Sequence, residues 1–383
     1  MKQKICVITG TRADYGILYP VMKAIKASKD LELYVVATGM HLMPEFGYTL
    51  KEIEKDGFQV YKKVDSSYKE DTGEAMADSL GKTLSAFAKI FNRLKPSIVL
   101  VLGDRGEMLA AAVAANYLNI PVAHIHGGEV SGHVDGLLRH AITKLSHIHF
   151  PATEGSKKRI IKLGEESWRI FVAGAPALDR ILNEKLPTAI ELAKKYEINL
   201  DEPLIILAQH PVITEEDEAA EQITASLEAI KELNFQSIVI YPNADAGGRR
   251  MINVIHKYEK NNNYIRSIIS MPHKDYLGLL KIASVLIGNS SSGIIEAPSF
   301  NLPVVNIGIR QDGRERNANV IDVPHNKMTI VRAIKKALYD KNFRKQIKKN
   351  KNLYGDGHAS MKIVKVLSKI QLGNMLLQKK ITY

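Results

Sequence analysis

Residues 97–125, SIVLVLGDRGEMLAAAVAANYLNIPVAHI, decide the fold class that the sequence predicts. Apolar runs at 97–102 and 121–125 are typical of strands, and 106–118 between them has the apolar spacing of a helix that packs one face on a sheet. Nearly continuous apolar runs favour parallel strands, because helices cover such strands on both faces. The stretch therefore predicts one strand–helix–strand unit of a parallel sheet.

The same alternation continues in both directions along the chain. The other predicted strands of the first half are residues 5–9, 33–37, 58–62, 147–150 and 169–173. Those of the second half are residues 204–208, 237–241, 265–269, 284–288 and 303–307. Helical patterns fill the intervals, so we expect an α/β protein with two doubly wound, Rossmann-like domains whose strand ends face a cleft.

The expected domain boundary lies in GAPALDRILNEKLP, residues 174–187, where glycine and proline interrupt the alternation. We expect a first domain at 1–175 and a second at 186–357. Residues 358–383 begin with a last helical pattern, which we expect to pack back on the first domain.

Composition narrows the class of protein. The chain has 383 residues, too many for one ordinary core, and a formal net charge of +12. Much of the excess charge lies at Lys345, Lys348, Lys349 and Lys351 without interleaved aromatic residues, which indicates a solvated helix face and no nucleic-acid partner. No run is long enough to span a membrane, and the single Cys6 suits a reducing cytoplasm.

The clearest ligand-binding motif is residues 287–315, IGNSSSGIIEAPSFNLPVVNIGIRQDGRE. Its small residues lead from a strand into a helix, so backbone amides and the hydroxyls of Ser290 and Ser291 can approach an anion. Ordinary serine capping would give the same local pattern. Glu296, placed to accept from ribose hydroxyls, and Arg310, after the next strand, favour a diphosphate site.

A second glycine-rich turn follows the first predicted strand, in GTRADYG at residues 10–16. It has the position of a phosphate-facing turn but lacks the G-x-G-x-x-G spacing of dinucleotide-binding proteins. Arg12 is placed to reach a pyrophosphate across the cleft. A structural ion pair with Asp14 or contact with a neighbouring helix is the alternative.

Charged residues follow two consecutive predicted strands of the first domain. LVLGDRGE places Asp104 and Arg105 after one strand, and AHIHGGEVSGHVDG places His126, Glu129 and Asp135 after the next. The ends of neighbouring parallel strands meet at one cleft wall, where paired acids can serve as general base and general acid. A lone Asp after a strand is usually a helix N-cap, whereas three acids together indicate a catalytic cluster.

Polar residues also end two strands of the second domain. AQHPVIT places His210 after one strand, and YPNADAGGR places Asn243 and Arg249 after the next. His210 could bind a phosphate or assist a leaving group, and could equally be a structural histidine. The sequence holds no Asp-x-Asp, no His-Glu-x-x-His and no Cys/His ligand set, so we expect neither a metal nor a cofactor.

The chain resembles the hydrolysing UDP-N-acetylglucosamine 2-epimerases of sialic acid synthesis, a family that includes the epimerase half of the animal bifunctional epimerase/kinase. Enzymes that act on UDP-N,N'-diacetylbacillosamine in legionaminic acid synthesis are similar. The matching motifs run in order over nearly the whole length: GTRADYG, TGMHL, LGDR, HIHGGE, RHAITK, QHP, PNADAG, GNSSSG, GIRQDGRE and YGDG. The resemblance implies a GT-B-like architecture, a UDP-sugar ligand and a homodimer.

The reaction that the resemblance implies is elimination followed by hydration. A base removes the C2 proton as UDP leaves C1, water adds to the resulting 2-acetamidoglucal at C1, and a proton returns to the other face of C2. Carboxylates would stabilise positive charge at C1, and cations with N–H donors the departing diphosphate. The implied catalytic residues are Asp104, Glu129, Asp135, His126 and His210, and the implied UDP-sugar contacts are Arg12, Arg105, Asn243, Arg249, Ser290, Ser291, Glu296 and Arg310.

One departure from the family pattern leaves the roles open. Non-hydrolysing relatives and the animal enzyme carry a glutamate where this chain has His126, so either His126 or Glu129 takes that proton-transfer role. The resemblance implies UDP-N-acetylglucosamine as substrate and N-acetylmannosamine as product, with UDP-N,N'-diacetylbacillosamine as the alternative substrate. A UDP-sugar glycosyltransferase and a non-catalytic UDP-sugar sensor are the more distant alternatives.

Overall fold

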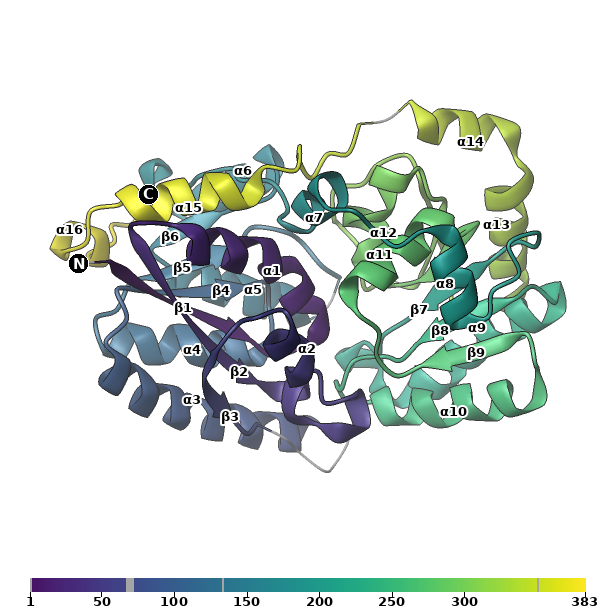
Figure 1. The fold of residues 1–383 in the computed structure, drawn as a ribbon, viewed down its shortest axis with the longest axis horizontal. Coiled ribbons are helices and arrows are strands. Elements are labelled where there is room, and N and C mark those ends of the chain that lie inside the picture. Colours follow the sequence, from purple (N-terminus) through teal and green to yellow (C-terminus); the bar gives the residue numbers. More distant parts are fainter. Residues whose placement is uncertain (1, 67–71, 133, 350) are drawn as a thin grey trace.

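The chain forms two lobes, each built on one central sheet with helices on its faces (Figure 1). A computed structural model describes residues 2–66, 72–132, 134–349 and 351–383. We call the lobe that holds the amino-terminal sheet the first lobe and the other the second lobe.

The first lobe contains a parallel sheet with the order β3-β2-β1-β4-β5-β6. The strand order reverses between β1 and β4, because β2 and β3 follow on one side of β1 and β4 to β6 on the other, and in doubly wound folds ligands bind beside such a point. The strands are β1 (Gln3–Thr9), β2 (Leu31–Thr38), β3 (Val60–Val64), β4 (Ile98–Leu102), β5 (Val122–Ile125) and β6 (Ile148–Phe150).

Helices cover both faces of this sheet, which is why its central strands are apolar throughout. Along β1, Ile5 packs in one hydrophobic cluster with Leu18, and Cys6 packs in the other with Phe87. Successive side chains of a strand alternate between faces, so both faces are buried. The helices are α1 (Arg12–Ala27), α2 (Leu50–Lys55), α3 (Gly73–Leu94), α4 (Gly106–Tyr117), α5 (Val134–Leu145) and α6 (Glu154–Lys162), with 3-10 turns at Gly39–Leu42, Pro44–Phe46 and Ser167–Arg169.

The second lobe repeats the plan, with the order β12-β11-β10-β7-β8-β9 and parallel pairing. Its strands are β7 (Ile205–Ala208), β8 (Ser237–Ile240), β9 (Ile265–Ile268), β10 (Val285–Gly288), β11 (Val304–Ile307) and β12 (Val320–Val323). Its helices are α8 (Ala189–Tyr196), α9 (Ala219–Leu233), α10 (Gly248–Asn261), α11 (His273–Ile282), α12 (Ser292–Ile295), α13 (Lys327–Tyr339) and α14 (Lys341–Lys348), with 3-10 turns at Ile213–Glu218 and Ala297–Phe300. Two doubly wound sheets confirm the predicted fold class.

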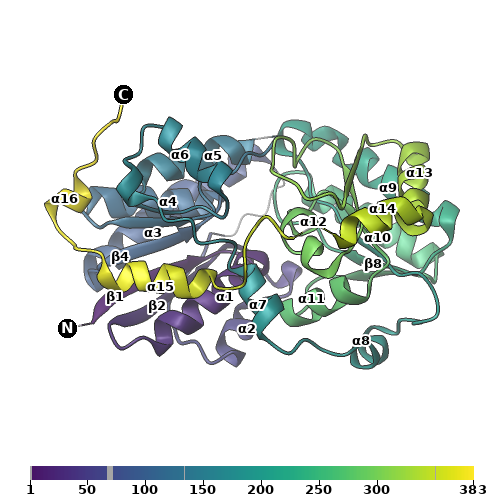
Figure 2. The same ribbon diagram turned by 90° about the horizontal axis from the view of Figure 1, so that it is seen from above.

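The chain crosses between the lobes twice, and hydrogen bonds join the two crossings. The first crossing contains α7 (Ala177–Asn183), and the second leads into α15 (Ala359–Lys369) and α16 (Asn374–Leu377). The amide of Ala175 donates to the carbonyl of Tyr354 at 2.7 Å. In Figure 2, α15 lies along α1 of the first lobe, and Ile363 shares a hydrophobic cluster with Leu18.

Three sequence predictions of secondary structure were wrong in detail. Residues 169–173 form an isolated parallel bridge, His149 to Ile170, because the next partner position beside them is Pro151, which has no N–H to donate to the ladder. The predicted helix 292–299 ends at Ile295, since Pro298 has no N–H to continue the ladder. Strand β12 was missed because this edge strand is only half-buried and lacks a continuous apolar run.

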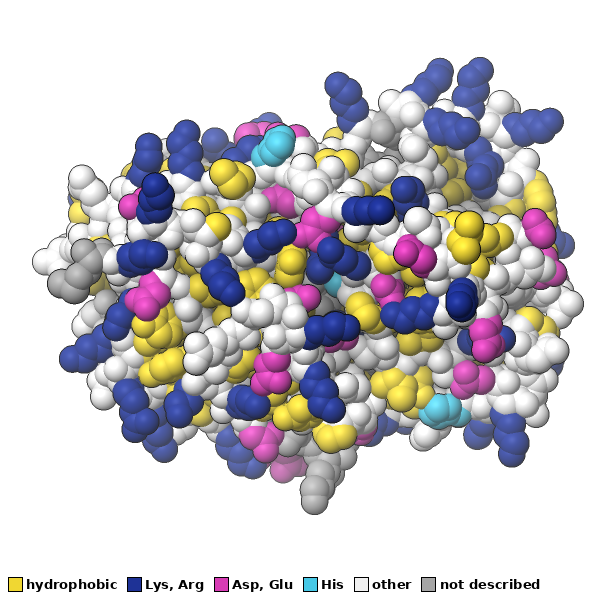
Figure 3. Space-filling model, in the orientation of Figure 1, with side chains coloured by type: hydrophobic (Ala, Val, Ile, Leu, Met, Phe, Trp, Pro, Cys, Tyr) yellow, Lys and Arg dark blue, Asp and Glu magenta, His cyan; other side chains and the backbone are white. Residues whose placement is uncertain are grey.

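Lys and Arg side chains are scattered over the face seen in Figure 3, with a group over α13 and α14. Helix α14 packs through Ile347 and leaves Lys341, Arg344, Lys345 and Lys348 exposed, as expected for a solvated face. Within the described residues, no helix is long and apolar enough to cross a membrane.

Candidate active site

A cavity of about 310 Å³ lies between the lobes, at the carboxyl ends of strands from both sheets. Most predicted site residues line it. From the first lobe they are Arg12, Asp104, Arg105, His126 and Glu129, and from the second lobe His210, Asn243, Ser290, Ser291, Glu296 and Arg310.

Two predicted site residues are not placed in this cavity. Asp135 falls outside the residues whose side chains the structure describes. Arg249, on α10, is absent from the cavity wall and instead donates to Glu45 of the first lobe, from Nη2 at 2.6 Å and from Nε at 3.2 Å. This bidentate pair holds the Arg249 guanidinium against the first lobe.

His126 and Glu129 form a buried pair in the turn after β5. Nδ1 of His126 lies 2.5 Å from Oε1 of Glu129, and the two residues are 4% and 2% exposed. An ionised carboxylate can only accept, so Nδ1 donates and the neutral ring keeps Nε2 as an acceptor. Nε2 has no hydrogen-bond partner among the described residues. His126 therefore has the arrangement of a general base held by a carboxylate.

Arg314, from the second lobe, completes this pair. Its Nη2 lies 2.6 Å from Oε2 of Glu129. Burial alone would raise the pKa of Glu129, but the charge of Arg314 and the contact with His126 outweigh it and lower that pKa to about 2. Glu129 thus stays ionised and keeps the His126 ring oriented.

Sequence reasoning missed Arg314, although it lies in the GIRQDGRE motif with the predicted Arg310. Its Nη1 donates to Oε1 of Gln311 at 3.0 Å, and Nε2 of Gln311 donates to the carbonyl of Asn289 at 2.8 Å. The segment after β11 therefore connects the serine-rich turn of the second lobe, residues 289–292, to the His126–Glu129 pair of the first lobe. The only available signal was the second arginine of the motif.

Asp104, at the end of β4, pairs with Arg139 of α5. Nη2 of Arg139 donates to Oδ2 of Asp104, and its Nη1 donates to the carbonyl of His126 at 3.0 Å. The side chain of Asp104 is 19% exposed, whereas that of Arg139 is 4% exposed. One buried guanidinium thus fixes both acid–base candidates, while Asp104 keeps access to the cavity.

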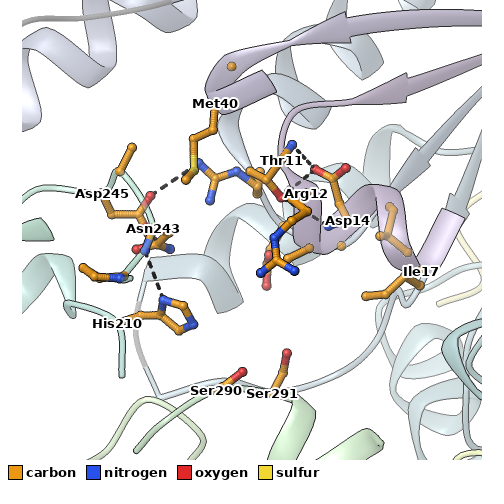
Figure 4. A pocket seen from close by; sticks show the side chains of 18 of the residues that line it. Thr11, Arg12, Asp14, Ile17, Met40, His210, Asn243, Asp245, Ser290 and Ser291 are labelled. Carbon is orange, nitrogen blue, oxygen red and sulfur yellow. Dashed lines mark hydrogen bonds and ion pairs between the residues drawn. The ribbon is translucent and has the colours of Figure 1, made fainter. Parts of the chain in front are cut away.

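His210 faces the cavity from the end of β7. Its Nδ1 accepts from the amide of Asn243 at 3.1 Å, so the neutral ring carries its proton on Nε2 as a donor. In Figure 4 the side chains of His210, Ser290, Ser291 and Arg12 point toward a common space. Hydroxyl, N–H and guanidinium donors around one space suit an anionic leaving group.

Arg12 reaches the opposite lobe, as the sequence suggested. Its Nη1 donates to the carbonyl of Met271 at 2.6 Å. Asp14 instead caps α1, where its Oδ2 accepts from the amides of Gly10 at 3.0 Å and Thr11 at 2.9 Å. Capping by Asp14 leaves Arg12 as part of the cavity wall.

Arg105 also bridges the lobes. Its Nη2 lies 3.5 Å from Oδ1 of Asp245, and its Nε lies 3.3 Å from Oε2 of Glu107. The side chain of Asn243 donates to Asp245 at 2.5 Å. The predicted site residues Arg105 and Asn243 therefore both contact Asp245, in one polar network across the cavity.

Glu296 directly follows α12, the short helix after the serine-rich turn, and is 5% exposed. Burial raises its pKa to about 7, and its Oε2 has no hydrogen-bond partner among the described residues. A buried carboxylate oxygen at a cavity wall is suited to accept from a ligand hydroxyl. The described part of the chain contains no cluster of three or more His, Cys, Asp or Glu side chains arranged to hold a metal ion.

Comparison with known proteins places this chain in a family. The family model described as UDP-N-acetylglucosamine 2-epimerase matches residues 23–368. The chain belongs to this family. The resemblance seen in the motifs is therefore confirmed, and the protein is an enzyme of the epimerase family.

Curated relatives include epimerases named for two sugar classes. The chain is 42% identical over 99% of both lengths to the UDP-N,N'-diacetylbacillosamine 2-epimerase (hydrolyzing) of Legionella pneumophila. It is 39% identical over 84% of both lengths to the GDP/UDP-N,N'-diacetylbacillosamine 2-epimerase (hydrolyzing) of Campylobacter jejuni. It is 36% identical over 88% of both lengths to a UDP-N-acetylglucosamine 2-epimerase of Neisseria meningitidis.

Solved structures of epimerases share the fold. The crystal structure of UDP-GlcNAc 2-epimerase from Neisseria meningitidis bound to UDP-GlcNAc matches with a TM-score of 0.80. The match covers 96% of this chain and 100% of that chain at 20% sequence identity. The GT-B-like architecture implied by the motifs is thereby confirmed.

Proposed function

We propose that the chain hydrolyses a UDP-linked 2-acetamido sugar with inversion at C2, releasing UDP and the free 2-epimer. One observation carries the proposal: acid–base groups of the first lobe and anion-binding groups of the second line the same cavity. The first set is His126, Glu129 and Asp104, and the second is Ser290, Ser291 and His210.

In the proposed reaction each of these residues has one step. Nε2 of His126 accepts the C2 proton while the C1–O bond breaks and its electrons leave with UDP. Asp104 stabilises the positive charge that builds at C1. Asp104 then accepts a proton from the water whose oxygen adds to C1 and delivers that proton to the opposite face of C2, while the original C2 proton passes from His126 to solvent. Glu129 acts through His126 as a positioning residue.

Departure of UDP requires stabilisation of negative charge on the diphosphate. His210 donates from Nε2, and Ser290 and Ser291 donate hydroxyl hydrogens. Because α12 has only four residues, these side chains and Arg12 contribute more than a helix dipole would. Glu296 accepts from the ribose hydroxyls.

Proton NMR in D2O tests the proposed reaction. Purified protein with UDP-N-acetylglucosamine should release UDP and free N-acetylmannosamine that carries deuterium at C2. UDP release without deuterium at C2 would show simple hydrolysis, and release only with an added acceptor would show glycosyl transfer. Saturable binding of both UDP-N-acetylglucosamine and UDP-N,N'-diacetylbacillosamine without turnover of either would show a sensor. Each of these three outcomes contradicts the proposal.

The second candidate substrate is UDP-N,N'-diacetylbacillosamine, which the printed names of the 42% and 39% identical relatives favour. The sugars differ at C4 and C6, remote from the reacting carbons. Comparing kcat/KM for the two sugar nucleotides decides between them.

We also propose a homodimer in the cytoplasm, with domain boundaries at residues 1–175, 186–357 and 358–383. Light scattering at several protein concentrations measures the assembly. A monomer at micromolar concentration would contradict the proposed homodimer.

A further inference from the structure

Three hydroxyl groups form a connected row from α11 to the serine-rich turn. The phenolic oxygen of Tyr276 lies 2.5 Å from Oγ of Ser292, and that Oγ lies 2.9 Å from Oγ of Ser290. We call Tyr276, Ser292 and Ser290 the hydroxyl chain. All three residues line the cavity, although the sequence predicted only Ser290 as a site residue.

Tyr276 is held at the far end of the hydroxyl chain by the core of the second lobe. It lies on α11 and is 8% exposed, and its ring packs in a hydrophobic cluster with Ile240 and Leu286. Burial raises the pKa of Tyr276 to about 12, so the phenol keeps its hydrogen at neutral pH. Tyr276 therefore enters the hydroxyl chain with a hydrogen to donate.

Ser290 stands at the cavity end of the hydroxyl chain. In Figure 4 its side chain points toward the space that His210 and Arg12 also face. Its Oγ already accepts from the amide of Ser292 at 3.3 Å. A serine hydroxyl has a single hydrogen, and the oxygens of an ionised diphosphate can only accept. A diphosphate bound at this turn therefore takes the hydrogen of Ser290.

The single hydrogen of each hydroxyl then fixes the direction of the hydroxyl chain. With the hydrogen of Ser290 on the diphosphate, the contact between Ser290 and Ser292 must use the hydrogen of Ser292. The contact between Ser292 and Tyr276 must in turn use the phenolic hydrogen. Each hydrogen bond in such a row polarises the next one, so the phenol strengthens the bond that Ser290 donates.

We propose that Tyr276 is a positioning residue for UDP: through Ser292 it directs the hydroxyl hydrogen of Ser290 toward the departing diphosphate. This inference rests on the proposed function, which assigns the diphosphate to the serine-rich turn. The contribution grows as the C1–O bond breaks, since negative charge then accumulates on the diphosphate.

A double-mutant cycle with UDP tests the positioning role. Tyr276→Phe removes the phenolic oxygen and keeps the ring in its cluster, and we expect UDP affinity to fall roughly 3- to 10-fold in isothermal titration. In a Ser290→Ala background the same substitution should change UDP affinity by less than about 2-fold, because the bond that Tyr276 strengthens is absent. A merely structural role of Tyr276 predicts equal losses in the two backgrounds. Equal losses, or unchanged affinity in a folded Tyr276→Phe variant, contradict the proposal.

Tyr258→Phe is the matched control, because Tyr258 donates to Glu228 in the same lobe and does not line the cavity. It should leave UDP affinity unchanged. A loss of affinity in this control would assign the effect to the lobe as a whole and overturn the role of the hydroxyl chain. If the unaltered protein neither binds UDP nor releases it from a UDP-sugar, the proposed function fails, which is a separate result.

Discussion

Glu129 of the first lobe and Arg314 of the second form an ion pair of 2.6 Å inside the cavity. The two residues are 2% and 8% exposed, so the pair is shielded from water. Because each partner belongs to a different lobe, the pair exists only while the lobes are together. Contact between the lobes thus fixes the carboxylate that orients His126.

Replacing Arg314 should impair His126 as the general base. In Arg314→Met the pKa of Glu129 should rise from about 2 toward its ordinary value, since the largest favourable charge is lost. Protonation of Glu129 would then begin at a higher pH, and the acid limb of kcat/KM should move upward. We expect kcat to fall about 100-fold, the lower end of general-base contributions. A pH profile from 4.5 to 8 measures both effects.

Arg316→Met is the control for this change, because Arg316 pairs with Asp322 within the second lobe. It should leave the acid limb in place. An unshifted limb in a folded Arg314→Met variant would show that the ion pair is structural only.

Asp104→Asn should nearly abolish turnover and keep UDP affinity. The amide cannot stabilise positive charge at C1 or return a proton to C2, so we expect kcat to fall by about 10²- to 10⁴-fold. Arg139 would lose its carboxylate partner, which calorimetric measurement of thermal unfolding would reveal as a modest loss of stability. Ordinary kcat in this variant would remove Asp104 from the mechanism.

Loss of both serine hydroxyls should weaken UDP binding. For Ser290→Ala combined with Ser291→Ala we expect a decrease of about 1–3 kcal/mol, since hydrogen bonds to charged groups are lost. Isothermal titration with UDP gives the value. Ser299→Ala is a suitable control, because Ser299 accepts from Asn352 outside the cavity wall. Unchanged affinity in the double variant would identify the turn as a helix cap only.

Glu296 should make UDP binding depend on pH. Burial raises its pKa to about 7, so in the free protein it is protonated below neutral pH and cannot accept from two ribose hydroxyls. UDP affinity should increase as pH rises from 6 to 8, and the increase should be smaller in Glu296→Gln. Titration of UDP itself affects both proteins equally, so the difference between them reports on Glu296. Identical pH dependence in the two proteins would exclude Glu296 from the ribose site.

The raised pKa of Glu296 also makes the stability of the folded protein depend on pH. A raised pKa in the folded protein stabilises below the ordinary value of 4.5, and this contribution is lost as pH rises through about 7. The fall in Tm between pH 5 and pH 8 should therefore be smaller in Glu296→Gln. A larger fall in the variant would contradict the assigned shift.

Much of the fold was predictable because the burial of a strand determines which residues that strand contains. Strand β4 is apolar at every position since helices cover both faces of the sheet, and that pattern is visible in the sequence. Strand β12, at an exposed edge, carries no such pattern and was missed. Pro298 should have ended the helix predicted at 292–299, because its missing N–H is a property of the residue itself.

From the sequence, the site residues could be placed only at the carboxyl ends of strands. Rules for parallel sheets bring His126 and Asp104 to one edge, and the structure places both there. Periodicity carries no information about partners across two lobes, so the roles of Arg314 with Glu129 and of Arg249 with Glu45 could not be derived. Those contacts depend on how the two sheets face each other.

The central claim is that both lobes act on one anomeric centre. The most direct measurement is a crystal structure of the Asp104→Asn variant with an intact UDP-sugar. We expect the diphosphate to contact His210, Ser290 and Ser291, and C2 to lie about 3–3.5 Å from Nε2 of His126. A sugar whose C2 lies beyond contact with His126, with the diphosphate away from the two serines, would contradict the account.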